Sequence, residues 1–158
     1  MAGARVLLID GHPDAGRLSA HLLDGYQAAL PTGAEVRRIA LRDLDFDPVL
    51  RRGYAAPQPL EPDLEQAAGA LDWCSHLALA FPLWWGAEPS LLTGFWDRVL
   101  LPGRAFRYHE KDPWWDRLMA GRAADVIVTM DTPPLYLRLA YFDPIGWRYR
   151  RQVLGFVG

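Results

Sequence analysis

The stretch from Leu77 to Leu101 constrains the fold more than any other part of the chain. Its first five residues, LALAF, are all apolar, which is typical of a central strand in a parallel sheet covered by helices on both faces. The loop Pro82–Glu88 follows. Apolar residues then recur at helical spacing, at Leu91, Leu92, Phe95 and Val99. We therefore predict a buried strand, a tight loop and an amphipathic helix, with the loop where ligands of such sheets bind.

Two adjacent tryptophans mark this loop as a candidate binding site. The rings of Trp84 and Trp85 suit stacking on a flat aromatic ligand, and packing of these rings in the core is the alternative. Gly86 lets the backbone turn tightly or approach a ligand closely. The loop is therefore a candidate site for a planar ligand.

The rest of the chain repeats the alternation of strand and helix. Further strands are predicted at residues 5–10, 35–41 and 125–130, and further helices begin near Ser19, Asp63, Leu135 and Pro144. The charges in 35–41 are typical of a sheet edge. Residues 43–62 are expected as a long loop with a helical turn near 49–52, and residues 102–121 as a second long loop. The order predicts one α/β domain, residues 1–158, with a doubly wound parallel sheet in three layers.

Composition narrows the classes of function. The net charge is −2 and the pI about 6.1, so the chain lacks the charge pattern of proteins that bind nucleic acid or anionic membranes. Cys74 is the only cysteine, so we expect no disulfide framework and no thiolate metal site. No signal peptide is evident, and no apolar run reaches the roughly 18 residues of a membrane span. We therefore expect a cytoplasmic protein with no membrane span and no nucleic-acid partner.

Three loops follow the apolar strands and are expected to meet at one rim of the sheet. They are Gly11–Ser19, Pro82–Glu88 and Met130–Pro134. The first suits a phosphate, because Ser19 and the free N–H groups of a helix start are donors and the helix dipole favours an anion. An ordinary helix cap is the alternative. The loop lacks the lysine of a P-loop, and the chain has neither a G-x-G-x-x-G fingerprint nor a nucleophile elbow.

Four motifs, taken together, resemble the NAD(P)H:quinone oxidoreductases, a family of flavodoxin-like flavoproteins. They are GHPD with a following serine, AFPLWWGAEPSLLTGFWDRVLLPGRAFRY, VTMDTPP and QVLGFVG, in the family's order over nearly the whole chain. The resemblance implies a flavin, FMN or FAD, and NAD(P)H as co-substrate. It also implies transfer of a hydride through the flavin to a quinone or similar acceptor, and a homodimer that shares its active sites.

The resemblance also implies roles for individual residues. The flavin phosphate end maps onto His12, Arg17, Leu18 and Ser19; the ring edge maps onto Pro82, Leu83, Trp84, Trp85 and Gly86; and the third loop contributes Thr129, Met130, Asp131 and Thr132. Phe106 and Tyr108 match aromatic residues that reach the partner's flavin and shape the substrate pocket. Tyr136 matches a tyrosine that donates a hydrogen bond in catalysis.

The sequence departs from the family pattern at three points. Arg17 replaces a small hydroxylated residue. The third loop lacks the two glycines found in the mammalian type of quinone reductase, and no histidine stands where the family's catalytic partner falls. A flavodoxin-like sheet has five strands, but only four are visible before Gly158. We expect either a truncated carboxyl terminus or a neighbouring chain over the open edge.

Two other functions stay open at this stage. One is a flavin-binding regulatory subunit without turnover, as some relatives are for potassium-efflux transporters. The other is a zinc-dependent deacetylase, whose first turn also contains His-Pro-Asp. For that reading His12, Asp14 and His21 are candidate ligands, but Ala15 replaces the second aspartate and no later histidine completes the set. We therefore predict no metal site.

Overall fold

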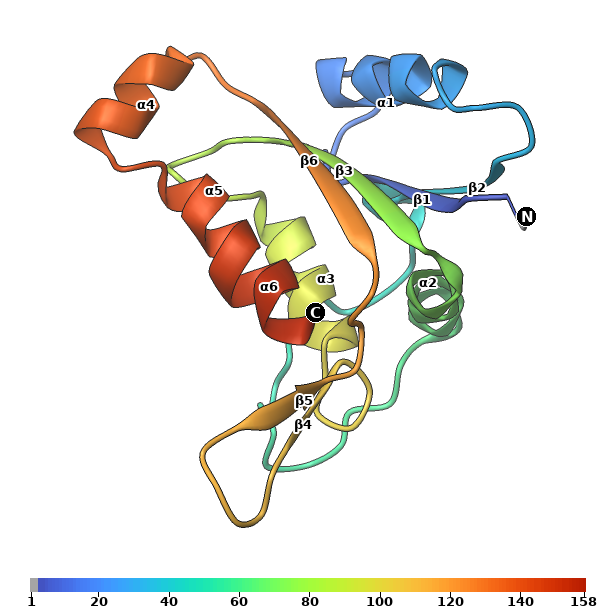
Figure 1. Ribbon diagram of the computed structural model, residues 1–158, viewed down its shortest axis with the longest axis vertical. Helices are drawn as coiled ribbons and strands as arrows, with labels where there is room; N and C mark the ends of the chain where they lie inside the picture. The colour runs from blue at the N-terminus through green and yellow to red at the C-terminus, as the bar shows by residue number, and fades with distance from the viewer. Residues whose placement is uncertain (1–2) are drawn as a thin grey trace.

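A four-stranded parallel sheet forms the centre of the computed structural model, which describes residues 3–158 (Figure 1). Its order is β2-β1-β3-β6, with bounds Glu35–Ala40 for β2, Arg5–Asp10 for β1, His76–Pro82 for β3 and Ala123–Thr129 for β6. The predicted strands are thus confirmed, and 35–41 lies at an edge as expected. Strand β3 runs one residue beyond its predicted end, because Pro82 still pairs in register with Thr129.

Helices cover both faces of the sheet and give the predicted three layers (Figure 1). Their bounds are Leu18–Ala28 for α1, Pro62–Trp73 for α2, Ser90–Val99 for α3, Pro134–Ala140 for α4, Pro144–Trp147 for α5 and Leu154–Val157 for α6. A π-helical turn, η2 (Arg148–Val153), joins α5 to α6. The helix predicted from Pro144 is therefore one continuous helical segment with a π-turn in its middle.

The hydrophobic core is divided by the sheet into two parts. On one face Leu8 and Ala78 pack against Leu23 of α1. On the other face Leu7 and Phe81 pack in a larger cluster with side chains of α2, α3 and the C-terminal helix, including the stacked pair Phe81–Tyr149. The larger core therefore lies on the side of α3, directly behind the loop Pro82–Glu88. No helix in the described part of the chain is long and apolar enough to cross a membrane.

The two long connections differ from the sequence prediction. Residues 102–121 contain an antiparallel hairpin of β4 (Phe106–Tyr108) and β5 (Trp115–Arg117), which lies at the bottom of Figure 1. Three-residue strands without clear alternation give too weak a signal to be predicted. The other connection begins with a 3₁₀ turn, η1 (Leu41–Asp43), and has no helix near residues 49–52, only turns.

A buried arginine fixes the connection between β2 and α2. Arg98 of α3 has no exposed side-chain surface and donates to the Glu61 carboxylate (Nη2–Oε2 2.8 Å) and to the carbonyls of Pro59 (2.7 Å) and Asp47. These partners replace the water lost by the two terminal nitrogens, whereas the buried Nε has no acceptor among the described residues. The long loop is therefore tied to the core by side-chain contacts rather than by secondary structure.

The two edges of the sheet differ in chemistry. The edge strand β2 carries Glu35, Arg37 and Arg38, the kind of charges that protect an edge from unwanted pairing. The other edge strand, β6, has the sequence AADVIVT with one charge, Asp125. Residues 3–158 supply no fifth strand beside it.

Candidate active site

The three predicted loops lie side by side at the carboxyl ends of β1, β3 and β6. The Gly11 N–H donates to the Ala80 carbonyl (2.8 Å), and the Leu83 N–H donates to the Thr129 carbonyl (2.8 Å). The His12 ring meets the Trp84 ring edge-on, with centroids 5.5 Å apart. The rim expected from the topology is thus confirmed, and it presents residues from three distant parts of the sequence on one surface.

A buried carboxylate anchors the first loop. The Asp10 side chain is almost fully buried; its Oδ1 accepts from the His12 N–H (3.1 Å) and the Ser19 hydroxyl (3.0 Å), and its Oδ2 accepts from Arg42 Nη1 (2.6 Å). Three donors of this kind satisfy a carboxylate away from water. Asp10 therefore fixes both ends of the loop, its first turn and the start of α1.

The first loop leaves backbone donors free. Helix α1 begins at Leu18, one residue earlier than predicted, so Ser19 is inside the helix and its hydroxyl binds Asp10 instead of capping. Within residues 3–158 the N–H groups of Gly16, Arg17, Leu18 and Ser19 have no acceptor. Together with the helix dipole they form a positive surface that suits an anion.

Arg17 lies beside this surface but is bound to a neighbour. Its Nε donates to Asp14 Oδ2 (2.7 Å), and this hydrogen bond holds the pKa of the Asp14 carboxyl below its usual value. The pair is exposed to solvent, so the guanidinium can turn towards an incoming anion at little cost.

The second loop is a tight turn that presents both tryptophans to solvent. The Trp84 and Ala87 backbones exchange hydrogen bonds of 2.9 and 3.0 Å around Trp85 (φ 53°) and Gly86 (φ 79°). Positive φ at both central residues is the geometry of a type I′ turn, which favours glycine or asparagine. Trp85 is fully exposed and Trp84 is 45% exposed. Core packing of the two rings is thereby excluded, and a residue in a strained conformation at a binding surface is a sign of function.

An ion pair between a buried carboxylate and a partly exposed arginine lies at the base of this turn. The Glu88 side chain has no exposed surface and binds Arg148 of η2, with Nη2–Oε1 at 2.7 Å and Nε–Oε2 at 3.2 Å. Arg148 and the exposed Arg150 belong to the same helical segment. The head group of Arg148 instead turns inward, since a buried carboxylate requires a partner.

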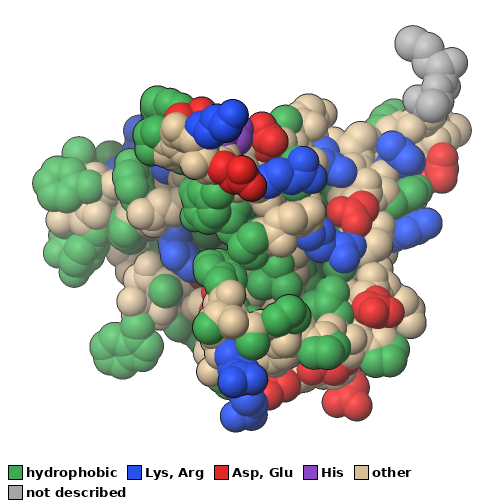
Figure 2. All heavy atoms as spheres, turned by 90° about the horizontal axis from the view of Figure 1, so that it is seen from below, with side chains coloured by type: hydrophobic (Ala, Val, Ile, Leu, Met, Phe, Trp, Pro, Cys, Tyr) green, Lys and Arg blue, Asp and Glu red, His purple; other side chains and the backbone are tan. Residues whose placement is uncertain are grey.

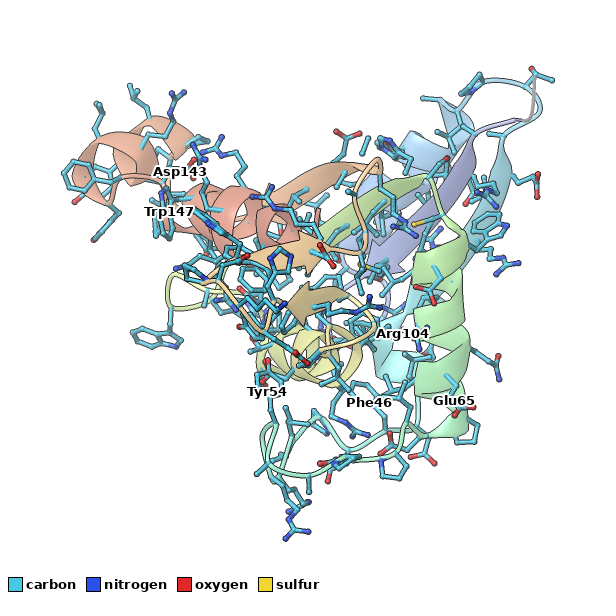
Figure 3. The ribbon with its side chains drawn as sticks, turned by 60° about the horizontal axis from the view of Figure 1, so that its bottom comes forward. Phe46, Tyr54, Glu65, Arg104, Asp143 and Trp147 are labelled. Carbon is cyan, nitrogen blue, oxygen red and sulfur yellow. The ribbon has the colours of Figure 1, made fainter. Side chains whose placement is uncertain are left out.

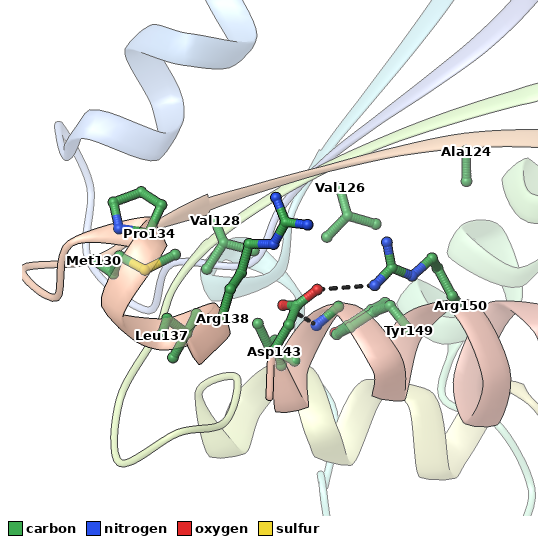
Figure 4. Close-up of a pocket in the computed structure, with 12 residues that line it drawn as sticks. Ala124, Val126, Val128, Met130, Pro134, Leu137, Arg138, Asp143, Tyr149 and Arg150 are labelled. Carbon is green, nitrogen blue, oxygen red and sulfur yellow. Dashed lines mark hydrogen bonds and ion pairs between the residues drawn. The ribbon is translucent and has the colours of Figure 1, made fainter. Parts of the chain in front are cut away.

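The third loop is partly exposed. Asp131 is exposed, whereas Met130 and Thr132 are half-buried. The predicted helix follows as α4, on which Tyr136 is 55% exposed and meets Tyr141 edge-on. Behind this loop a groove of about 350 Å³ runs between β6 and the helices α4 and α5 (Figure 4). Its lining includes Val126, Val128, the Asp143–Arg150 ion pair, and Met130 and Pro134 of the third loop. It contains no residue of the first two loops, so the groove adjoins the rim only at the third loop.

The structure places Phe106 and Tyr108 on β4, in the hairpin rather than on the rim. Phe106 is buried against Phe156, whereas Tyr108 is 59% exposed and packs edge-on against Phe106. Tyr54, in the connection between β2 and α2, lines a surface hollow together with Phe106 and Tyr108 (Figure 3). Within one chain these aromatics form a surface of their own, away from the three loops (Figure 1).

Exposed apolar side chains gather around α4. Figure 2 shows hydrophobic groups at the end of the molecule that α4 occupies in Figure 1. They include Leu135, Tyr136, Leu139, Tyr141 and Phe142, each at least half exposed. An exposed apolar patch of this kind typically marks an interaction surface.

Sequence reasoning missed the four side chains that anchor the rim: Asp10, Arg42, Glu88 and Arg148. A signal existed for Asp10, because a charge ends the otherwise apolar run RVLLID. No local signal pointed to the pairing of Glu88 with a residue 60 positions away.

The candidate zinc ligands do not converge in the described chain. Within residues 3–158 no three His, Cys, Asp or Glu side chains are placed to hold a metal ion. The Nδ1 of His12 accepts the Asp14 N–H (2.9 Å), and His21 lies near Asp24 on the exposed surface. This arrangement does not support the alternative of a zinc-dependent deacetylase.

Comparison with known proteins identifies the family. A model of proteins with a flavodoxin-like fold matches residues 4–158. An FMN-dependent NADH:quinone oxidoreductase of Azotobacter vinelandii is 31% identical over 156 residues, which cover 90% of this chain and 73% of the relative. An uncharacterised NAD(P)H oxidoreductase of Escherichia coli is 29% identical over 131 residues, 77% of this chain and 67% of the relative.

A solved structure has the same architecture over nearly the whole chain. The crystal structure of Smu.1420 from Streptococcus mutans superimposes with a TM-score of 0.81 at 25% identity, covering 97% of this chain and 81% of the other. The sequence resemblance, the strand order and these comparisons agree. The chain belongs to the flavodoxin-like family that includes the NAD(P)H:quinone oxidoreductases.

Proposed function

We propose that this protein is a flavin-dependent NAD(P)H oxidoreductase that holds FMN across the three loops of the rim and reduces a quinone or a similar acceptor. The observation that carries the proposal is the rim itself, where unpaired N–H groups lie next to two exposed tryptophans. The printed activity of the Azotobacter vinelandii relative supports the choice of FMN and of a quinone.

The first loop fits the phosphate end of the cofactor. The N–H groups from Gly16 to Ser19 are free to donate, and α1 adds the positive end of its dipole. Arg17 adds a charge that can leave Asp14 for a phosphate oxygen. In this proposal His12 and Leu18 complete the phosphate site.

The second and third loops fit the ring end. Trp84 and Trp85 offer flat surfaces beside the backbone N–H groups of the turn, which would favour negative charge on a reduced ring. Pro82 and Leu83 form the base of that wall, and residues Thr129 to Thr132 close the opposite side. When bound, the flavin supplies the hydride chemistry, and these residues bind it, orient it and exclude water.

A homodimer is part of the same proposal. The exposed apolar residues around α4 are of the kind that mark an interaction surface, and Tyr136 is one of them. Phe106 and Tyr108 lie on a separate surface of the chain, so they would complete the site of a partner rather than their own. Tyr136 would then donate its hydrogen bond inside a closed, shared pocket. A single domain over residues 1–158 and a cytoplasmic location, expected from the lone Cys74, belong to the proposal as well.

The test is reconstitution followed by turnover. The purified chain is incubated with FMN or with FAD, freed of unbound cofactor, and assayed with NADH or NADPH and a soluble benzoquinone. We expect FMN to be retained and quinone reduction to depend on both FMN and the reduced nicotinamide. Retained flavin without turnover would favour the regulatory-subunit alternative. No retention of either flavin would overturn the proposal.

A further inference from the structure

The ion pair Glu88–Arg148 has a geometry that a surface pair would not adopt. Both Glu88 oxygens accept from the guanidinium, at 2.7 Å from Nη2 and 3.1 Å from Nε to Oε1, and at 3.2 Å from Nε to Oε2. The Glu88 side chain is completely buried, and Arg148 is its one side-chain partner in the described chain. Bidentate contact fixes the orientation of both groups as well as their distance.

The pair joins the turn to a distant and unusual backbone segment. Glu88 follows Ala87, the last residue of the Trp84–Ala87 turn, whereas Arg148 is the first residue of the π-turn η2. Single π-turns inside helices are rare and frequently occur at functional sites. The guanidinium also acts on Asp97, where burial raises the pKa of the carboxyl and Arg148 opposes that shift. Arg148 thus lies near two acidic groups and forms its ion pair with Glu88.

The tip of the turn has few packing contacts, so the turn depends on contacts at its base. Trp85 is fully exposed at a φ of 53°, so it has no core contacts to offset its strained conformation. The other contacts of this segment are the two backbone bonds between Trp84 and Ala87, the bond from the Leu83 N–H to the Thr129 carbonyl, and the edge-on contact of Trp84 with His12. Glu88 is the only fully buried side chain among residues 83–88. Loss of Arg148 would leave the buried Glu88 carboxylate unpaired, and this cost is relieved either by protonation or by movement of the turn that brings Glu88 to solvent.

We propose that Glu88 and Arg148 are positioning residues that hold the Trp84–Ala87 turn in the shape that receives the cofactor ring. The inference rests on the proposed function for what the turn receives, but not for how the turn is held. Neither residue touches the reacting atoms. The C-terminal helix thereby controls the geometry of a loop formed 60 residues earlier.

Hydrogen exchange tests the holding of the turn without any cofactor. The amides of Trp84 and Ala87 are measured in the full chain and in the variants Arg148→Met, Arg148→Lys, Glu88→Gln and the swapped double variant Glu88→Arg/Arg148→Glu. We expect about tenfold faster exchange of both amides in Arg148→Met and Glu88→Gln, less in Arg148→Lys, and recovery in the double variant. The amide of Gly11, which lies in the first loop and donates to the Ala80 carbonyl of β3, should exchange at an unchanged rate.

A matched control is Arg104→Met. Arg104 also binds a carboxylate, Asp72 (2.6 Å), but at the surface beside α2 (Figure 3). Its loss should leave the turn amides unchanged. Unchanged exchange in both Arg148→Met and Glu88→Gln would overturn the inference, as would equal acceleration by the control.

The dissociation constant and midpoint potential of bound FMN test the consequence. We expect Arg148→Met and Glu88→Gln to weaken FMN binding about tenfold and to shift the potential, with recovery in the swapped variant. Faster exchange combined with unchanged FMN affinity and potential would contradict a positioning role. If the wild-type chain binds no FMN, the proposed function fails, whereas the exchange result still decides whether the pair holds the turn.

Discussion

The first two loops of the rim are each anchored by a buried carboxylate, but by different means. Asp10 binds His12, Ser19 and Arg42, which all lie within 32 residues along the chain. Glu88 binds one side chain, Arg148, which lies 60 residues later in the chain. The first loop is thus held by a local network, and the second by one long-range contact.

The difference agrees with what each loop must do. A phosphate site needs several N–H groups in fixed directions, and Asp10 secures both the first turn and the helix start that supply them. A ring site needs one turn in a fixed position, and the ion pair of Glu88 with Arg148 at the base of the turn fixes that position. We therefore expect the first loop to tolerate single losses except at Asp10, and the second loop to depend on a single pair.

The largest effect is expected for Asp10→Asn. The substitution leaves Arg42, whose side chain is 19% exposed, beside a neutral partner. Loss of one partner from a buried pair costs about 3 kcal/mol in the free energy of unfolding, which urea denaturation would measure. Asp72→Asn, at the exposed pair with Arg104, serves as the control and should cost less than about 1 kcal/mol. Equal losses of unfolding free energy in Asp10→Asn and Asp72→Asn would contradict the claim that Asp10 anchors the first loop.

Trp85→Gly separates stability from binding in the second loop. Glycine adopts positive φ without strain, and Trp85 is fully exposed, so no packing is lost. We expect the free energy of unfolding to rise by about 1 kcal/mol, while FMN binding weakens about tenfold because a stacking surface is removed. Thermal unfolding and a fluorescence titration would measure the two quantities. A variant that is both less stable and unchanged in binding would show that the tryptophan has a structural role.

Ser19→Ala removes one donor from the local network. The hydroxyl is buried and donates to Asp10 at 3.0 Å. Since two other groups still bind Asp10, we expect a loss of about 1 kcal/mol in the free energy of unfolding. Urea denaturation of Ser19→Ala and Asp10→Asn side by side would show whether the stabilisation is distributed over the partners of Asp10. A cost as large as that of Asp10→Asn would mean that the hydroxyl alone holds the helix start.

Arg17→Ala should have the smallest effect on stability. Arg17 and Asp14 are both exposed, and pairs of this kind contribute about 0.5 kcal/mol or less. FMN affinity should nevertheless fall a few-fold, and its dependence on salt should weaken, because one charge near the phosphate is lost. Titrations at two salt concentrations would measure this. An unchanged salt dependence would place Arg17 outside the phosphate site.

The sequence predicted those features that depend on local patterning. The strand run RVLLID, the LALAF strand and the helical spacing of α3 follow from periodicity alone, and the parallel rim follows from their order. The β4–β5 hairpin was missed because three-residue strands have no usable period. Glu88–Arg148 and Arg98–Glu61 were missed because pairing across 60 or 37 positions is decided by tertiary packing, which no single-sequence pattern encodes.

The central claim is that the rim binds a flavin that accepts hydride, and anaerobic addition of NADH to the FMN-loaded protein tests it most directly. The absorbance of the bound flavin is followed after one equivalent of NADH is added. The account predicts retained flavin whose visible bands bleach and then return when a quinone is added. Bands that persist after NADH, or a protein that retains no flavin at all, would contradict it.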